Sequence, residues 1–272
     1  MDPRLQIRVQ RYGWDRAAEV YDRAWSGPLE PAQSTLLEMA DLKPGEGVVE
    51  VACGSGLVTL RAADAVGPGG RVVATDLSDG MLERARRAVD DAELEQVTLL
   101  RRDAGALELS DDEFDVAISA LGLMYVPDPG VALREMARVL RPGGRAVLAV
   151  WGERKRCGWA DLFPIVDARV NTEVCPLFFQ LGTGDALRYA MDEAGFREIV
   201  VRRLETISHF PSEARILEAA FAGGPVAMAY SRFDETTRGE VHREYLESVE
   251  EYRGGDGYRV PGEFVVARGE VG

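Results

Sequence analysis

Three acidic residues and two glycines have the types and spacing that could bind a polar ligand. Glu50 lies in the run VVEVACGSG at 48–56, in which Gly54 and Gly56 are separated by one residue. Asp76 closes the apolar run RVVATD, and Asp103 follows the run VTLLRR. A glycine turn lets a ligand approach the backbone, and a carboxylate can accept hydrogen bonds from ribose hydroxyls or an adenine amino group. The pattern suits a ligand with a ribose, an adenine and a positive charge.

Two common phosphate-binding loops do not fit this sequence. The dinucleotide fingerprint needs a third glycine three residues after the second, and that position is Thr59. The pattern GxxxxGK[ST] is also missing from the chain. S-adenosylmethionine has a ribose, an adenine and a positive charge but no phosphate. We therefore expect S-adenosylmethionine as the cofactor, with S-adenosylhomocysteine as its product.

The elements that must position these residues alternate between two patterns. Short β-branched runs predict strands, and apolar residues spaced three and four apart between them predict helices. The predicted strands are 47–52, 71–76, 97–102, 114–121 and 144–151. This alternation is typical of a parallel sheet flanked by helices, whose ligands bind at the carboxyl ends of the strands.

The flanking segments complete the expected fold. Helical patterns at 15–25 and 32–42 precede the first strand, and prolines at 28, 31 and 44 are expected to break the path between them and the sheet. A sixth strand is predicted at 197–205 and a last one within 257–269. We expect an α/β fold with a Rossmann-like, seven-stranded, mostly parallel sheet that has helices on both faces.

A long insertion separates the last two predicted strands. Residues 208–255 contain two helical patterns separated by GGP at 223–225. With no internal repeat or clear linker, this segment is interpreted as a helical cap over the acceptor pocket. The main domain would then comprise residues 1–207 and 256–272.

Composition narrows the possible partners. The formal charge is -14, from 46 acidic and 32 basic residues, which disfavours a nucleic-acid partner. The apolar runs are too short to span a membrane, and the first residues lack the apolar core of a secretory signal, so we expect a cytoplasmic protein. Three cysteines without CxxC spacing indicate free thiols, with no disulfide framework and no metal site.

Four motifs in order resemble a known family. They are VVEVACGSG, VVATDLSDGMLERAR, RRDAGALELSDDEFDVAISALGLMYVPDP and REMARVLRPGGRAVLAVWG. Together they resemble the class I S-adenosylmethionine-dependent methyltransferases, over roughly residues 10–152. They are most similar to the branch that includes quinone-biosynthesis (type 11) methyltransferases and many enzymes that act on small molecules.

The resemblance implies roles for the residues around the glycine turn. Glu50 would orient the loop and, through water, the amino group of the cofactor. The small residues would lie under the methionine portion: Ala52, Gly54, Ser55 and Gly56. Ala52 stands where a glycine is more usual, and we expect this change to be tolerated.

The resemblance also implies contacts with the nucleoside. Asp76 would hold the ribose, Leu77 and Met81 would pack on the adenine faces, and Asp103 with the Ala104 amide would read the adenine edge. Two simpler alternatives stay open, because Asp76 could only cap the following helix and Asp103 could only shape a turn.

The remaining candidates concern the methyl-transfer end. Leu121 would face the methionine end, and Tyr21 would close over the cofactor. Residues proposed to contact the substrate are Trp14, Met124, Tyr125, Phe178 and His209. Core packing is the alternative role for the apolar and aromatic members of this group.

The expected function is methyl transfer to a small, partly apolar molecule. Because the methyl group of a sulfonium is already activated, holding the acceptor in line with water excluded supplies most of the rate. No motif fixes a catalytic base, so the catalytic residues stay open. The sequence also leaves open the oligomeric state and the choice among O, N and C acceptors. One alternative is a protein that binds the cofactor as a scaffold, a sensor or a non-methylating enzyme. A nicotinamide oxidoreductase is a more distant alternative, which Thr59 disfavours.

Overall fold

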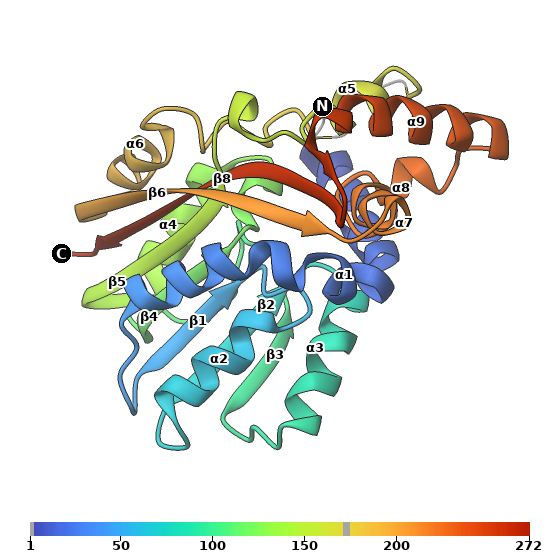
Figure 1. The fold of residues 1–272 in the computed structure, drawn as a ribbon. Helices are drawn as coiled ribbons and strands as arrows, with labels where there is room; N and C mark the ends of the chain where they lie inside the picture. Colours follow the sequence, from blue (N-terminus) through green and yellow to red (C-terminus); the bar gives the residue numbers. More distant parts are fainter. Residues whose placement is uncertain (1–2, 171–174) are drawn as a thin grey trace.

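The computed structural model describes residues 3–170 and 175–272. Its centre is one sheet with the strand order β3-β2-β1-β4-β5-β8-β6 (Figure 1). The strands are β1 (Gly47–Val51), β2 (Arg71–Asp76), β3 (Val97–Arg101), β4 (Phe114–Ala120), β5 (Leu140–Trp151), β6 (Arg197–Phe210) and β8 (Gly257–Glu270). A two-residue strand, β7 (Arg253–Gly254), pairs with β8.

The register confirms the predicted mostly parallel sheet. Strands β1 to β5 run parallel to one another, and β8 lies antiparallel between β5 and β6. All five residues of β1 are buried, as expected for a central strand covered on both faces. The carboxyl ends of β1, β2, β3 and β4 therefore lie at one edge of the sheet, and Glu50, Asp76, Asp103 and Leu121 lie at or just after these ends.

Helices cover both faces of the sheet, as predicted. On one face α1 (Pro3–Ala40), α2 (Leu57–Val66) and α3 (Asp79–Asp91) pack on one another, and α4 (Pro129–Val139) and α6 (Ala186–Glu193) pack together on the other (Figure 1). The remaining α-helices are α5 (Leu162–Asp167), α7 (Glu213–Leu217), α8 (Ala227–Tyr230) and α9 (Glu235–Ser248). Within the described ranges, no helix has the length and apolar content to cross a membrane.

The expected break between two N-terminal helices is wrong. A single helix, α1, continues through Pro28 and Pro31. A proline inside a helix removes a backbone hydrogen bond at a cost of about 3 kcal/mol, but tertiary packing can offset that loss. Buried residues occur on the same helix before, between and after the two prolines, at Ala24, Leu29 and Leu36. Burial of this continuous face explains why the helix is not interrupted.

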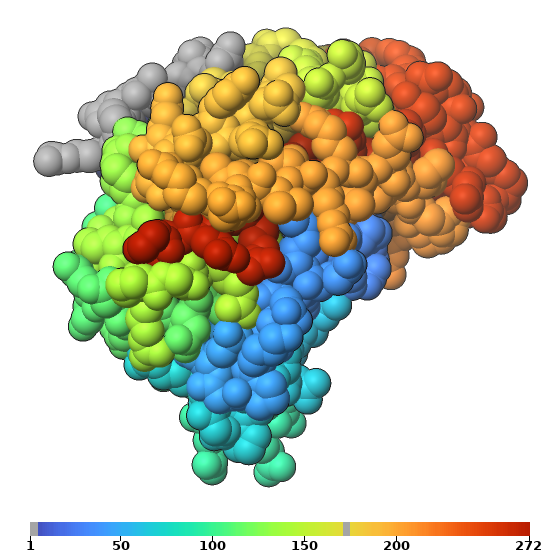
Figure 2. Space-filling view, turned by 90° about the vertical axis from the view of Figure 1, so that its left-hand side faces the viewer, coloured from blue at the N-terminus to red at the C-terminus, as the bar shows by residue number. Residues whose placement is uncertain are grey.

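The segments that follow β5 gather at one end of the molecule. In Figure 2 the atoms coloured yellow to red form the upper and wider part of the molecule, above most of the blue and green atoms. The segment 208–255 contributes α7, a π-helix (Glu218–Ala222), α8 and α9. The π-helix and α8 pack on α1, and α9 packs on α5. The strand β6 also continues to Phe210, five residues beyond its predicted end at 205.

Candidate functional site

The turn between β1 and α2 has a backbone shape that few residues adopt. Three of its residues have positive φ angles, with 59° at Ala52, 57° at Gly54 and 91° at Gly56. Glycine adopts this region without penalty, whereas alanine is strained by about 1–2 kcal/mol. The backbone N–H of Cys53 donates to the carbonyl of Thr75 at 2.9 Å, which holds the turn against β2. The Cys53 thiol is buried and its pKa is raised by burial, so it is a packing group and not a nucleophile.

A second turn packs tightly against the first. Leu121 and Gly122 follow β4, and Leu121 also has a positive φ angle, of 64°. A Cβ atom placed on Gly122 would lie 2.3 Å from the Cβ of Ala52. The alanine that replaces the usual glycine is therefore accommodated because the facing residue has no side chain.

Asp76 connects the glycine turn to the start of α3. Its carboxylate accepts hydrogen bonds from the backbone N–H of Gly54 at 2.8 Å and from that of Ser78 at 2.8 Å. Burial raises the pKa of Asp76, and these backbone donors oppose that rise. Ser78, not Asp76, provides the side-chain cap of α3, through a 3.1 Å hydrogen bond from the Met81 N–H. Asp76 also lines the adjoining cavity, and its ribose role stays a prediction beside these structural contacts.

Asp103 combines a turn with a place on the cavity wall. Its carboxylate accepts a hydrogen bond from the Gly105 N–H at 2.8 Å, as a turn-forming aspartate does. Asp103 and Ala104 also line the cavity, beside Arg102. The turn role is therefore present, and the adenine role stays a prediction.

Glu50 lies behind the glycine turn and does not line the cavity. The hydroxyl of Thr59 donates to the Glu50 carboxyl at 2.5 Å, and the hydroxyl of Thr75 donates to the Glu50 carbonyl at 3.0 Å. Only 1% of Glu50 is exposed. Burial raises its pKa to about 8, against the opposing effect of the Thr59 hydrogen bond. Glu50 is thus a protonated, buried group at neutral pH.

Two further predicted residues also support the turn from outside the cavity. The Ser55 hydroxyl donates to the carboxylate of Asp22 on α1. Gly56 is the N-cap residue that precedes α2, and a Cβ atom there would lie 3.3 Å from the Cβ of Ala85 on α3. These contacts fix the turn between two helices.

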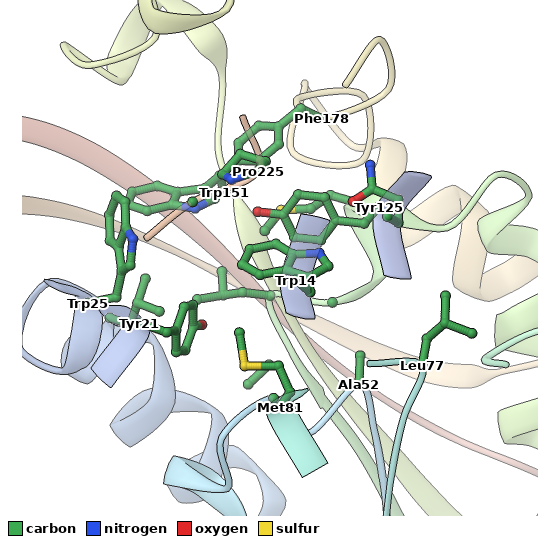
Figure 3. Close-up of a pocket in the computed structure, with 18 of the residues that line it drawn as sticks. Trp14, Tyr21, Trp25, Ala52, Leu77, Met81, Tyr125, Trp151, Phe178 and Pro225 are labelled. Carbon is green, nitrogen blue, oxygen red and sulfur yellow. The ribbon is translucent and has the colours of Figure 1, made fainter. Parts of the chain in front are cut away.

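A single cavity of about 1250 Å³, counting its open mouth, extends from this turn to an aromatic end. In Figure 3, Ala52, Leu77 and Met81 lie at one end, and the rings of Trp25, Tyr125 and Phe178 lie toward the other. The structure brings together at this cavity the following predicted residues: Trp14, Tyr21, Ala52, Gly54, Asp76, Leu77, Met81, Asp103, Ala104, Leu121, Met124, Tyr125 and Phe178.

The structure does not bring His209 to the cavity, so its substrate contact stays a prediction. This residue belongs to β6, where side chains alternate between the two faces. The neighbouring Phe210 is buried and lines the cavity, whereas the His209 side chain is 43% exposed. The His209 ring instead contacts the backbone carbonyl of Asp256 at 2.9 Å.

Several cavity residues were not predicted from the sequence. On α1, Ile7, Gln10 and Trp25 extend the same helical face as Trp14 and Tyr21, so the spacing of three and four residues could have identified them. The other unpredicted aromatic residues that line the cavity are Trp151, Phe210 and Tyr245. They come from separate segments, and no local pattern distinguishes them from core residues.

The aromatic rings form a connected wall. Trp14 contacts Tyr21 and Tyr125 edge-on, with centroid distances of 5.8 Å and 5.0 Å. Phe178 continues the wall at 5.5 Å from both Tyr125 and Trp159. Burial raises the pKa values of Tyr21 and Tyr125, so both hydroxyls stay protonated. The arrangement offers a polar end for one ligand and an apolar end for another.

Comparisons with known proteins agree with this geometry. A family model described as a methyltransferase domain matches residues 48–144. The demethylmenaquinone methyltransferase of Bacillus cereus is 39% identical over 111 residues, which are 41% of this chain and 47% of that protein. Over residues 48–144 the chain is therefore similar to S-adenosylmethionine-dependent methyltransferases of class I. It spans about half the length of the curated relatives that it matches.

Solved structures extend the likeness in fold to most of this chain. A phosphoethanolamine N-methyltransferase of Haemonchus contortus, in complex with S-adenosylhomocysteine, has a TM-score of 0.62 at 16% identity, with 95% of this chain and 58% of that chain covered. The [4+2]-cyclase SpnF has a TM-score of 0.58 at 20% identity, with 89% and 81% covered. At these identities the likeness concerns the fold alone.

The close approach of the two turns predicts a coupled pair of substitutions. Gly122→Ala should lower the free energy of unfolding by about 1–3 kcal/mol, because its Cβ would clash with Ala52. In an Ala52→Gly background the clash partner is removed, and the same substitution should cost at least about 1 kcal/mol less. Urea unfolding of the four proteins of this cycle measures the coupling. Equal costs in both backgrounds would contradict the contact.

The buried acid predicts a dependence of stability on pH. The folded pKa of Glu50 is about 8 and its ordinary value is 4.5, so between these values the folded state holds more protons than the unfolded state. Its contribution to stability therefore falls as pH rises through this window. Glu50→Gln stays neutral, so the stability of this variant relative to the parent should increase from pH 5 to about 8 and then level off. A constant difference across that window would show that Glu50 has an ordinary pKa.

Proposed function

We propose that this protein transfers the methyl group of S-adenosylmethionine to a small, partly apolar molecule. The observation that carries the proposal is the single cavity that joins the family's cofactor-binding turn to an aromatic chamber. The cofactor would occupy the end near Asp76, and the acceptor would occupy the end near Tyr125. No nucleic acid partner is proposed, because the formal charge of -14 opposes binding to phosphates.

The residues at the cofactor end have chemistry that fits S-adenosylmethionine. Asp76 retains lone pairs beyond the two used by Gly54 and Ser78, and these could accept hydrogen bonds from ribose hydroxyls. Leu77 and Met81 present apolar surface to a flat base, and Asp103 presents a carboxylate to its edge. When bound, the cofactor supplies an activated methyl group.

Positioning and exclusion of water are the contributions that we assign to the protein. The charged residues among the described lining residues are Asp76, Arg102 and Asp103, all near the ends of β2 and β3. No histidine or lysine belongs to the described lining, so this proposal assigns no base. A ring-lined chamber would hold the acceptor in line with the methyl group and exclude water from it.

The helical segment 208–255 is proposed as a cap over the acceptor end. The support is that it supplies part of the cavity wall: Ile216, Ala219, Ala220, Gly224, Pro225 and Tyr245. The pair Gly223 and Gly224 could act as the pivot of a lid. A cytoplasmic location is also proposed, since all three cysteines are free thiols, as reducing compartments favour.

Methyl-labelled S-adenosylmethionine tests the reaction. The protein is incubated with a panel of phenols, amines and reduced quinones, the last suggested by the name of the Bacillus cereus relative. Transfer of label to an acceptor supports the proposal, and omission of the acceptor is the control. Binding of the cofactor without label transfer to any member of a broad panel would favour the scaffold, sensor or non-methylating alternative.

A substitution at Asp76 tests the cofactor end. Asp76→Ala should weaken binding of S-adenosylhomocysteine by about 10- to 100-fold, because hydrogen bonds to charged groups contribute about 1.5–3 kcal/mol. Asp79→Ala is the matched control, since this nearby acid is 57% exposed, pairs with Arg11 and does not line the cavity. Calorimetry measures both affinities and also the affinity for NAD, which should not bind. An unchanged affinity in the Asp76 variant would leave Asp76 with only its structural role.

A further inference from the structure

The aromatic end of the cavity differs chemically from the cofactor end. All four tryptophans of the chain line the cavity: Trp14, Trp25, Trp151 and Trp159. Phe178, Phe210 and Tyr245 add to the same wall. Flat rings pack well against flat rings, through offset or edge-on contacts, so this wall suits an aromatic ligand.

Two polar side chains at this end lack partners for part of their hydrogen-bonding capacity. Gln10 is 7% exposed, and its amide N–H donates to the Cys175 sulfur at 3.5 Å. Among the described residues, no hydrogen bond is formed by its amide oxygen or by the hydroxyl of Tyr125. Both residues line the cavity, and the hydroxyl end of Tyr125 points toward its middle in Figure 3. A ligand that fills the cavity displaces water from these two groups, so a ligand that supplies hydrogen bonds to them is favoured over one that does not.

The charges of the lining exclude another class of ligand. The three charged lining residues lie at the cofactor end, and no charged side chain of the described residues lines the aromatic end. An ionised ligand placed among these rings would lose its hydration without gaining a counterion. An uncharged ligand does not incur this penalty.

We infer that the aromatic end binds an uncharged aromatic molecule with a hydroxyl or carbonyl oxygen, and that Gln10 and Tyr125 recognise this oxygen. A hydroxyl can donate to the Gln10 amide oxygen and accept from the Tyr125 hydroxyl, while a carbonyl can accept from Tyr125. The inference rests on the proposed function, because it assigns this end of the cavity to the methyl acceptor. Gln10 and Tyr125 are positioning residues for the acceptor in this account.

Three probes of similar shape separate the effect of the oxygen on affinity from the effect of a charge. Hydroxybiphenyl carries the oxygen, methylbiphenyl replaces it by a methyl group, and biphenylcarboxylate adds a charge. Calorimetry on the full chain saturated with S-adenosylhomocysteine measures their affinities. Because every tryptophan lines the cavity, a change in tryptophan emission reports that the probe has entered it. We expect hydroxybiphenyl to bind about 5-fold more tightly than methylbiphenyl, and biphenylcarboxylate to bind most weakly.

Substitutions assign the preference to the two side chains. Tyr125→Phe and Gln10→Leu should each reduce the hydroxyl-over-methyl preference by about 3-fold, with little change in the affinity for methylbiphenyl. Gln6→Leu is the matched control, because Gln6 is buried on the same helix but does not line the cavity. Unchanged affinity for S-adenosylhomocysteine shows that each variant is folded.

The outcomes distinguish this inference from the proposed function. Equal binding of hydroxybiphenyl and methylbiphenyl, tightest binding of biphenylcarboxylate, or an unaltered preference in both variants would overturn the inference. Label transfer to an ionic acceptor would overturn it while supporting methyl transfer. The expected preferences without label transfer to any acceptor would support the inference about the chamber and count against the proposed reaction.

Discussion

The carboxylate of Asp76 is the constraint on which the cofactor end depends. It accepts backbone hydrogen bonds from Gly54, in the turn after β1, and from Ser78, at the start of α3. These hydrogen bonds hold two segments that are separate in sequence in one geometry. Gly54 from the first segment and Leu77 from the second both line the cavity. Burial alone would favour the neutral acid, but donors aimed at its oxygens favour the charged form that accepts hydrogen bonds best.

A second hydrogen bond explains why this turn differs from a phosphate-binding loop. Thr59 stands where the dinucleotide fingerprint requires a glycine, and its hydroxyl is bonded to the buried Glu50. This hydrogen bond therefore connects the first turn of α2 to β1. The Thr59 side chain fills space that a glycine would leave for close packing of helix and strand. A dinucleotide-binding loop was ruled out from the sequence because of Thr59, and this contact is the structural reason.

Sequence reasoning succeeded where the signal was local. The strands and the acids at their ends were predicted because apolar runs and glycine turns act within a few residues, and the register of the sheet then confirmed the arrangement. It failed at Pro28 and Pro31, because packing of a long helical face overrode a local rule. It also underestimated the length of β6, which continues to Phe210 and includes His209, a residue that does not line the cavity.

The aromatic end could not be predicted as a unit because it has no local signal. Trp14 on α1 and Phe178 were proposed as substrate contacts only beside the alternative of core packing, and Tyr245 on α9 was not proposed at all. Only the tertiary fold brings these residues to one cavity. The two ends also depend on different forces. Directional hydrogen bonds to fixed backbone groups define the cofactor end, whereas contacts among rings define the other and tolerate changes of shape. Substitutions in the aromatic wall can therefore alter which molecule fits there without disturbing the turn held by Asp76.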